Sequence, residues 1–281
     1  MDHRAQAIGV FDSGVGGLTV LRALRDELPH EQFVYLGDTA RLPYGTKSAE
    51  SVVRYALQAA AALIARRVKA LIVACNTASA VALPALRVRH ADLPVIGVVD
   101  PGADAAVAAT RSGCIAVIGT EATVRGGAYQ RAIAQRRPDA EVRALACQLF
   151  VALAEEGWTS GAVAEATAQR YLGPLLLPHW AAGAADTLVL GCTHFPVLRA
   201  VIREVVGERV TIVDSAVTTA RAAHALLRER QLLRAPAMSP GATALAAMSF
   251  LATDNSERFA AIGARFLGSA IGAHQVALID L

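Results

Sequence analysis

The sequence LIVACNT at residues 71–77 returns in similar form as LVLGCTH at residues 188–194. Each stretch is an apolar run that ends in a cysteine and continues into polar residues. An apolar run of this length is typical of a strand covered by helices on both faces of a parallel sheet, and the polar residues after it are typical of the start of a helix. The two stretches therefore predict two buried strands, each with a cysteine at its junction with a helix.

Short apolar runs alternate with alanine-rich amphipathic segments along the whole chain, and this alternation predicts an α/β fold with mainly parallel sheets. The expected strands cover residues 7–11, 32–36, 70–74, 95–99, 115–118, 141–145, 187–190 and 210–213. The expected helices cover residues 17–27, 49–66, 78–89, 101–109, 123–136, 162–175, 197–205 and 218–230. The tail, residues 247–281, contains SFLATD at residues 249–254, and a helix through Leu267 is expected after it.

Two further echoes occur in the same order. IGVFDS at residues 8–13 is similar to IAVIGT at residues 115–120, and VVDP at residues 98–101 is similar to IVDS at residues 212–215. Chance similarity between buried strands is one interpretation. The other is two similar α/β domains related by a pseudo-two-fold axis, with strand ends that face one shared cleft, where open α/β sheets bind ligands. That interpretation assigns residues 1–98 plus 210–281 to a first domain with Cys75, and residues 99–209 to a second domain with Cys192.

Composition excludes several classes of protein. Hydrophobic residues make up 54% of the 281 residues and charged residues 18%, which excludes a disordered chain. The longest mainly apolar stretch, residues 56–75, is interrupted by Arg66, Arg67 and Lys69, so we expect no membrane span. The first residues lack a signal-peptide pattern, which predicts a cytoplasmic protein. The net charge of +3 comes from scattered arginines, so no nucleic-acid partner is required.

The four cysteines fall into two pairs. Cys114 and Cys147 lie within or beside apolar runs, where a cysteine is typically a small core residue. Cys75 and Cys192 each follow a strand and precede a helix. Backbone N–H groups at a helix start lower the pKa of a thiol, so we expect these two thiols to be reactive. A disulfide is not expected in a cytoplasmic chain of this size.

Two thiols that face each other across a cleft suit one kind of chemistry. Racemisation of an amino acid removes the Cα proton from one face and returns a proton to the other. Two fixed acid/base groups, one a thiolate and one a thiol, do this directly. A pseudo-symmetric pair of domains supplies that arrangement.

Four motifs resemble the cofactor-independent aspartate/glutamate racemase superfamily, and within it the bacterial glutamate racemases. They are IGVFDSGVGGLT at residues 8–19, LGDTARLPYGTKS at residues 36–48, VACNTAS at residues 73–79 and LGCTHFP at residues 190–196. A weaker match is CQLFVALAEEG at residues 147–157, and the tail near Thr253 and Asp254 fits as well. The resemblance implies two α/β domains with the active site between them, glutamate as substrate, no cofactor, and a supply of D-glutamate for peptidoglycan.

The resemblance also implies roles for individual residues. Cys75 and Cys192 match the catalytic acid/base pair, with Cys75 facing D-glutamate and Cys192 facing L-glutamate. Asp12 matches the carboxylate that assists the first cysteine, and His194 the imidazole that assists the second. The implied substrate contacts are Asp12, Ser13, Pro43, Tyr44, Gly45, Asn76, Thr77, Thr193 and His194, with Thr120 as a weaker candidate. Tyr44 has an equal claim to be a loop anchor.

Glu155 matches a further acidic residue of the cleft. The family commonly has proline where Gln148 and Ala152 stand here. The choice between Glu155 and Glu156 as the residue that faces the cleft therefore stays open.

Several alternatives to this interpretation remain. A metal site formed by Cys75, Cys192 and His194 lacks a fourth ligand and the usual ligand spacing. Lys47 and Lys69 are the only lysines, and neither is typical of a pyridoxal phosphate lysine. An aspartate or hydantoin racemase, a small-ligand binding protein and a dithiol redox protein remain open, and so does a homodimer.

Overall fold

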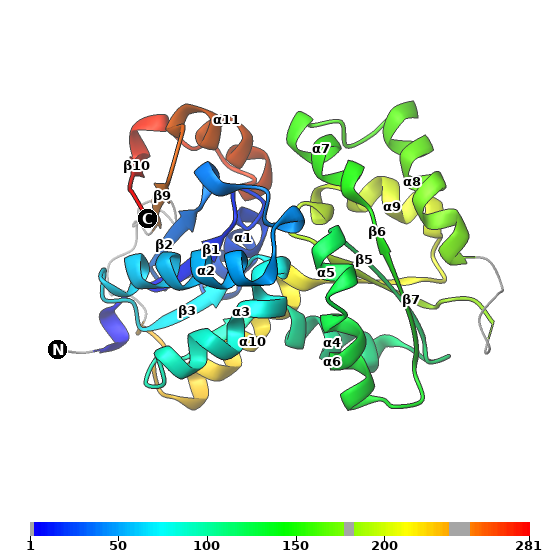
Figure 1. Ribbon diagram of the computed structural model, residues 1–281, viewed down its shortest axis with the longest axis horizontal. Helices are drawn as coiled ribbons and strands as arrows, with labels where there is room; N and C mark the ends of the chain where they lie inside the picture. The colour runs from blue at the N-terminus through cyan, green and yellow to red at the C-terminus, as the bar shows by residue number, and fades with distance from the viewer. Residues whose placement is uncertain (1–2, 177–182, 236–247) are drawn as a thin grey trace.

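The computed structural model describes residues 3–176, 183–235 and 248–281. Within these ranges the chain forms two β-sheets, in which all strand pairs are parallel (Figure 1). The predicted α/β class with parallel sheets is confirmed. Residue 247, where the expected tail begins, lies outside the described residues.

The first sheet has six strands in the order β10-β9-β2-β1-β3-β4, and the second has four in the order β6-β5-β7-β8. The first consists of β1 (Ile8–Asp12), β2 (Phe33–Gly37), β3 (Ala70–Val73), β4 (Val95–Gly97), β9 (Met248–Ala252) and β10 (Val276–Leu278). The second consists of β5 (Cys114–Gly119), β6 (Glu141–Ala146), β7 (Thr187–Gly191) and β8 (Thr211–Asp214). The order β2-β1-β3-β4 is therefore repeated as β6-β5-β7-β8.

Eleven α-helices lie in the described ranges. They are α1 (Leu18–Glu27), α2 (Ala49–Ile64), α3 (Asn76–Arg89), α4 (Val99–Ala109), α5 (Glu121–Arg125), α6 (Ala128–Arg136), α7 (Gln148–Glu156), α8 (Ala162–Leu176), α9 (Arg199–Val206), α10 (Ser215–Glu229) and α11 (Ser256–Leu267). Short 3₁₀ turns are η1 (His3–Ala5), η2 (Thr39–Arg41), η3 (Tyr44–Thr46), η4 (Phe195–Leu198) and η6 (Ala273–Gln275). No helix in the described ranges is long and apolar enough to cross a membrane.

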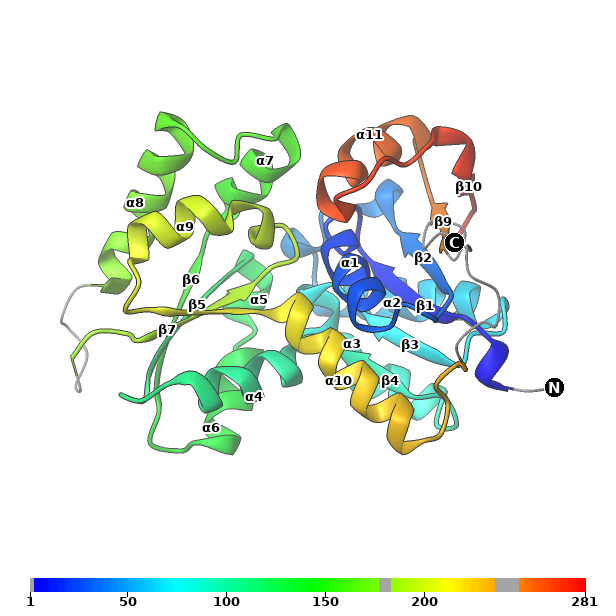
Figure 2. The ribbon, with the colours of Figure 1, turned by 180° about the vertical axis from the view of Figure 1, so that it is seen from behind.

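Both faces of each sheet are covered, which explains why the central strands are apolar throughout. In β1, Val10 packs in the core shared with α1, α10 and α11, whereas Phe11 packs in the core shared with α2 and α3. In β5, Val117 packs with α4 and α6, and Ile118 faces the core that includes α7, α8 and α9. Figures 1 and 2 show the two sheets side by side, with α10 running from the second sheet back behind the first.

Three sequence expectations need correction. The expected strand at residues 95–99 ends at Gly97, and Val99 is the first residue of α4. The third echo therefore matches β4 with β8 in the correct order but in the wrong register. α7 was not predicted, although Gly157 ends it in a left-handed conformation (φ 79°) that is typical of a helix end. Strand β8 lies beyond the expected domain boundary at residue 210, yet it pairs with β7. We therefore propose that the second unit extends through β8.

Candidate active site

The carboxyl ends of the central strands bring the predicted site residues together. In the first sheet Phe11 of β1 pairs with Val73 of β3, and in the second Gly119 of β5 pairs with Gly191 of β7. The residues after these strands are consequently neighbours. Several of them cap the next helix, because their side chains accept a hydrogen bond from its backbone: Cys75 caps α3, Thr120 caps α5 and Asp214 caps α10.

Cys75 is buried, and its sulfur lies 3.6 Å from the Ser13 hydroxyl and 3.4 Å from the backbone nitrogen of Ala78. Burial and, to a smaller extent, the Asp12 charge raise the pKa of the Cys75 thiol to about 12, although the hydrogen bonds with Ala78 and Ser13 act to lower it. The predicted lowering of this pKa is therefore wrong. The helix N–H group acts in the expected direction, but burial outweighs it.

Asp12 is fully buried at the end of β1. Its Oδ2 accepts a hydrogen bond from the Gly14 backbone at 3.0 Å, whereas Oδ1 has no hydrogen-bond partner among the described residues. Burial raises the pKa of Asp12, and the charge of His194 opposes this rise. An unpaired buried oxygen of this kind fits a donor supplied by a ligand.

Cys192 has a different set of neighbours. Its sulfur lies 3.8 Å from His194 Nδ1, and His194 Nε2 lies 3.2 Å from Glu155 Oε1. Burial alone would lower the pKa of His194, but the contacts with Cys192 and Glu155 raise it to about 10. Glu155 is in turn paired with Arg258 at 3.5 Å, whereas Glu156 is exposed. The structure thus places Glu155, and not Glu156, beside the predicted site.

The two halves meet closely at these residues. A Cβ atom on Gly16 would lie 2.5 Å from the His194 ring and 2.5 Å from Thr193 Oγ1. The Thr19 hydroxyl donates to the Thr193 carbonyl at 2.9 Å. The loop after β1 is therefore in contact with the loop that carries Cys192, and a side chain at position 16 would require the His194 ring and the Thr193 hydroxyl to move.

Polar groups of α3 meet the second sheet. The Asn76 Oδ1 accepts a hydrogen bond from Tyr129 of α6 at 2.7 Å, and Asn76 Nδ2 is buried without a hydrogen-bond partner among the described residues. Thr77 Oγ1 lies 3.1 Å from Thr120 Oγ1 and 3.2 Å from Thr123 Oγ1. These hydroxyl and amide groups are suited to bind a carboxylate.

Pro43, Tyr44 and Gly45 form a loop that packs across to the second sheet. The Tyr44 hydroxyl donates to Asp38 at 2.5 Å and its ring packs against Phe11, which fits the role of loop anchor. A Cβ atom on Gly45 would lie 2.9 Å from Thr120. The Tyr44 side chain and the Gly45 Cα are therefore both packed against other residues of the protein.

Cys114 and Cys147 lie in the core as expected, each with at most 1% of its surface exposed. Cys75 and Cys192 are 5% exposed, so exposure alone does not separate the two pairs. Their polar neighbours do. Within the described part of the chain, no group of three histidine, cysteine or acidic residues is placed to hold a metal ion.

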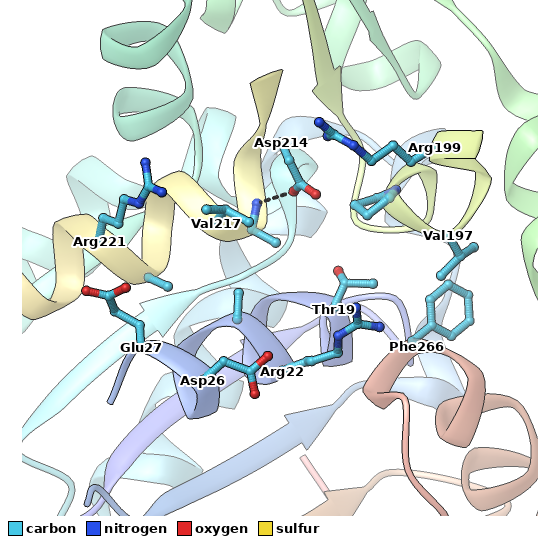
Figure 3. A pocket seen from close by; sticks show the side chains of 14 residues that line it. Thr19, Arg22, Asp26, Glu27, Val197, Arg199, Asp214, Val217, Arg221 and Phe266 are labelled. Carbon is cyan, nitrogen blue, oxygen red and sulfur yellow. Dashed lines mark hydrogen bonds between the residues drawn. The ribbon is translucent and has the colours of Figure 1, made fainter. Parts of the chain in front are cut away.

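A separate cavity of about 350 Å³ lies behind the site, between α1, η4, α9 and α10 (Figure 3). It is lined by charged side chains of both signs, and neither Cys75 nor Cys192 contributes to its wall. Thr19, which holds the Thr193 carbonyl, is part of that wall. The two halves are therefore not closely packed at this place behind the site.

Sequence reasoning missed three residues that the fold brings to the site: Tyr129, Thr123 and Arg258. Arg258 lies in α11 and pairs with Glu155 of α7, and Tyr129 of α6 contacts Asn76 of α3. No local pattern could have connected them, since each contact joins segments that are far apart in the sequence. Thr123 follows Thr120 by one helical turn, and that spacing was the available signal.

Two similar α/β units that each contribute a strand-end cysteine to one site define the class to which this chain belongs. The family described as Asp/Glu/Hydantoin racemase matches residues 18–223. The chain is a member of that family.

Within this family, the chain is similar to several glutamate racemases over nearly its whole length. A glutamate racemase from Geobacter metallireducens is 51% identical over 97% of each chain. Among solved structures, a glutamate racemase isoform from Bacillus anthracis has a TM-score of 0.89 at 36% identity and covers 99% of both chains. A glutamate racemase from Francisella tularensis in complex with D-glutamate has a TM-score of 0.86 at 34% identity, with 99% of this chain and 98% of that chain covered.

Proposed function

We propose that this isomerase interconverts L- and D-glutamate, with Cys75 and Cys192 as its two acid/base groups. One observation supports this above the rest: matched positions in two sheets of the same strand order carry a cysteine, and each cysteine has its own proton-carrying neighbour, Asp12 or His194. This is the arrangement that proton removal on one face and return on the other requires.

Two groups without a hydrogen-bond partner among the described residues supply the first substrate contacts in this proposal. The free Oδ1 of Asp12 accepts from the substrate ammonium group, and Nδ2 of Asn76 donates to a carboxylate. The hydroxyl groups of Ser13, Thr77, Thr120 and Thr193, and the backbone of residues 43–45, complete the set of donors and acceptors. With the substrate held in this way, the Cα–H bond lies between the two sulfur atoms.

In the L-to-D direction Cys192 takes the Cα proton and the Cys75 thiol gives a proton to the opposite face. The positive charge on His194 stabilises the Cys192 thiolate, and Glu155 keeps His194 in place. In the reverse direction the roles exchange: the Cys75 thiol first loses its proton, its thiolate takes the Cα proton, and the Cys192 thiol gives a proton to the opposite face. The step needs no cofactor, because every proton moves between the substrate and side chains of this chain.

We further propose that the product supplies D-glutamate for peptidoglycan, and that the protein acts in the cytoplasm. All four cysteines are free, which fits a reducing compartment. Both the role in peptidoglycan supply and the cytoplasmic location depend on the proposed glutamate racemase activity.

Chiral chromatography of the purified protein with L-glutamate, without added cofactor, tests the activity. We expect a racemic mixture, no loss of rate with EDTA, and poor turnover of aspartate, whose side-chain carboxylate is one methylene closer to Cα. Loss of activity with EDTA that zinc restores, or faster turnover of aspartate than of glutamate, would contradict the proposal.

A further inference from the structure

Tyr129 connects the two halves of the candidate site, although nothing in its sequence context indicates a role. It lies in α6 beside the second sheet, its side chain is 1% exposed, and its hydroxyl donates to Asn76 Oδ1 at 2.7 Å. Asn76 is the first residue of α3, directly after Cys75. The bond thus joins the second unit to the residue beside the first catalytic cysteine.

Two glycines form a slot for the Tyr129 ring. A Cβ atom on Gly102 would lie 3.0 Å from Cε1 of the ring, and a Cβ atom on Gly191 would lie 3.0 Å from Cε2. Gly191 directly precedes Cys192. The ring is therefore fixed against the segment that carries the second cysteine while its hydroxyl holds Asn76.

The Asn76 amide is turned with its oxygen toward Tyr129. The oxygen accepts the hydroxyl hydrogen at 2.7 Å, which the amide nitrogen could not do. This leaves Nδ2, with two N–H groups, buried and without a hydrogen-bond partner in the described part of the chain. A buried donor without a partner is unfavourable unless a ligand supplies the acceptor.

We propose that Tyr129 is a positioning residue, which orients the Asn76 amide so that Nδ2 donates to a carboxylate of the substrate. The inference rests on the proposed racemase function and deepens it. Tyr129 acts on substrate binding through Asn76, and it takes no part in proton transfer.

Tyr129→Phe tests this, because it keeps the ring in its slot and removes only the donor. We expect KM for both enantiomers to rise about fivefold to tenfold, with kcat within about twofold of wild type, as for loss of a contact made equally in ground and transition states. Tyr171→Phe is the matched control: Tyr171 lies in α8, and its hydroxyl accepts a hydrogen bond from the Leu149 backbone at 3.2 Å. Its KM should equal that of wild type.

A double-mutant cycle separates positioning from a general structural effect. In the Asn76→Ala background, Tyr129→Phe should change KM by less than about twofold, since the group through which it acts is gone. An equal rise in both backgrounds, or an unchanged KM in Tyr129→Phe, overturns the proposal. A wild-type protein without glutamate racemisation would instead contradict the proposed function itself.

A second variant covers the case in which Tyr129→Phe fails to fold. Asn76→Asp keeps an oxygen to accept the Tyr129 hydrogen and removes the Nδ2 donor. We expect KM to rise by at least about tenfold, because a carboxylate then faces a carboxylate. A wild-type KM in this variant also overturns the proposal.

Discussion

Cys75 and Cys192 occupy matched positions, but the charges beside them differ. Burial and the neighbouring Asp12 raise the pKa of Cys75 to about 12, so Cys75 is a thiol at neutral pH. The pKa of His194 is about 10 despite its burial, so a positive charge lies beside the Cys192 sulfur. In the free site the Cys75 half therefore holds a thiol proton, whereas the Cys192 half holds a positive charge on His194.

Single-cysteine variants in D₂O should reveal this difference. Cys192→Ala should exchange the Cα proton of D-glutamate without inversion, at a rate that rises about tenfold per pH unit between about pH 7 and 9, because Cys75 acts only as its minor thiolate form. Cys75→Ala should exchange L-glutamate with a much shallower pH dependence, because His194 keeps its proton up to about pH 10. Proton NMR measures both rates. Racemisation by either variant near the wild-type rate would show that one base suffices.

At the scale of elements, the loop between β1 and α1 sets how closely the two halves approach. Its Gly16 lies directly against Thr193 and His194. Because the neighbours are the His194 ring and the Thr193 hydroxyl, an added methyl group must displace either the loop or these two side chains.

Gly16→Ala should therefore lower kcat/KM by at least about tenfold while it changes the free energy of unfolding by no more than about 2 kcal/mol, as for a modest steric insertion. Gly14→Ala in the same loop is the control, because its Cβ would lie 3.5 Å from Leu42 in ordinary contact. Steady-state kinetics and urea unfolding of both variants provide the measurement. Equal activity of the two variants would show that the contact at Gly16 is not needed.

The same scale shows what could be predicted from the sequence. Central strands such as β1, β3 and β7 were predicted to within about two residues, since strands covered on both faces are apolar throughout. β4 ends at Gly97 and not at Val99, because an apolar run does not reveal where a helix takes over. α7 was missed although Phe150 and Leu153 have helical spacing and Gly157 ends it.

Site residues within one motif were equally predictable, because a strand end and the following helix start are local features. The pairs Glu155 with Arg258 and Asn76 with Tyr129 were not, since packing between distant elements forms them. The pKa of Cys75 was predicted in the wrong direction for the same reason. A helix start is visible in the sequence, whereas burial beside Asp12 depends on the whole fold.

At the scale of the whole molecule, a buried ion pair closes the first unit at the edge opposite the site. Lys69 Nζ lies 2.6 Å from Glu31 Oε2 and also donates to the backbone oxygens of Arg4 and Leu232. Glu31 Oε1 accepts from the Arg234 backbone. The pair thus ties the N-terminal turn, the segment before β2, the start of β3 and the segment after α10 together.

Glu31→Ala should lower the free energy of unfolding by about 3–5 kcal/mol, because it leaves the Lys69 ammonium buried without its carboxylate. Glu121→Ala, which breaks an exposed pair with Arg125, should cost less than about 1 kcal/mol. Urea unfolding of both variants measures the difference. At urea concentrations below the unfolding transition, Glu31→Ala should keep the wild-type kcat, because Lys69 and Cys75 lie at opposite ends of β3. A loss of stability no larger than that of Glu121→Ala would show that the buried pair is dispensable.

The equilibrium of a racemisation limits how a difference between the two halves can appear in the kinetics. The enantiomers of an amino acid have equal free energy in water, so microscopic reversibility fixes the quotient of forward and reverse kcat/KM at unity for every pH and every variant that still racemises. Asp12 in one half and His194 with Glu155 in the other break the symmetry of the scaffold. That chemical asymmetry can make kcat and KM differ between the two enantiomers, but the ratio of the two kcat/KM values stays at unity. A substitution confined to one half must therefore lower kcat/KM for both directions by the same factor.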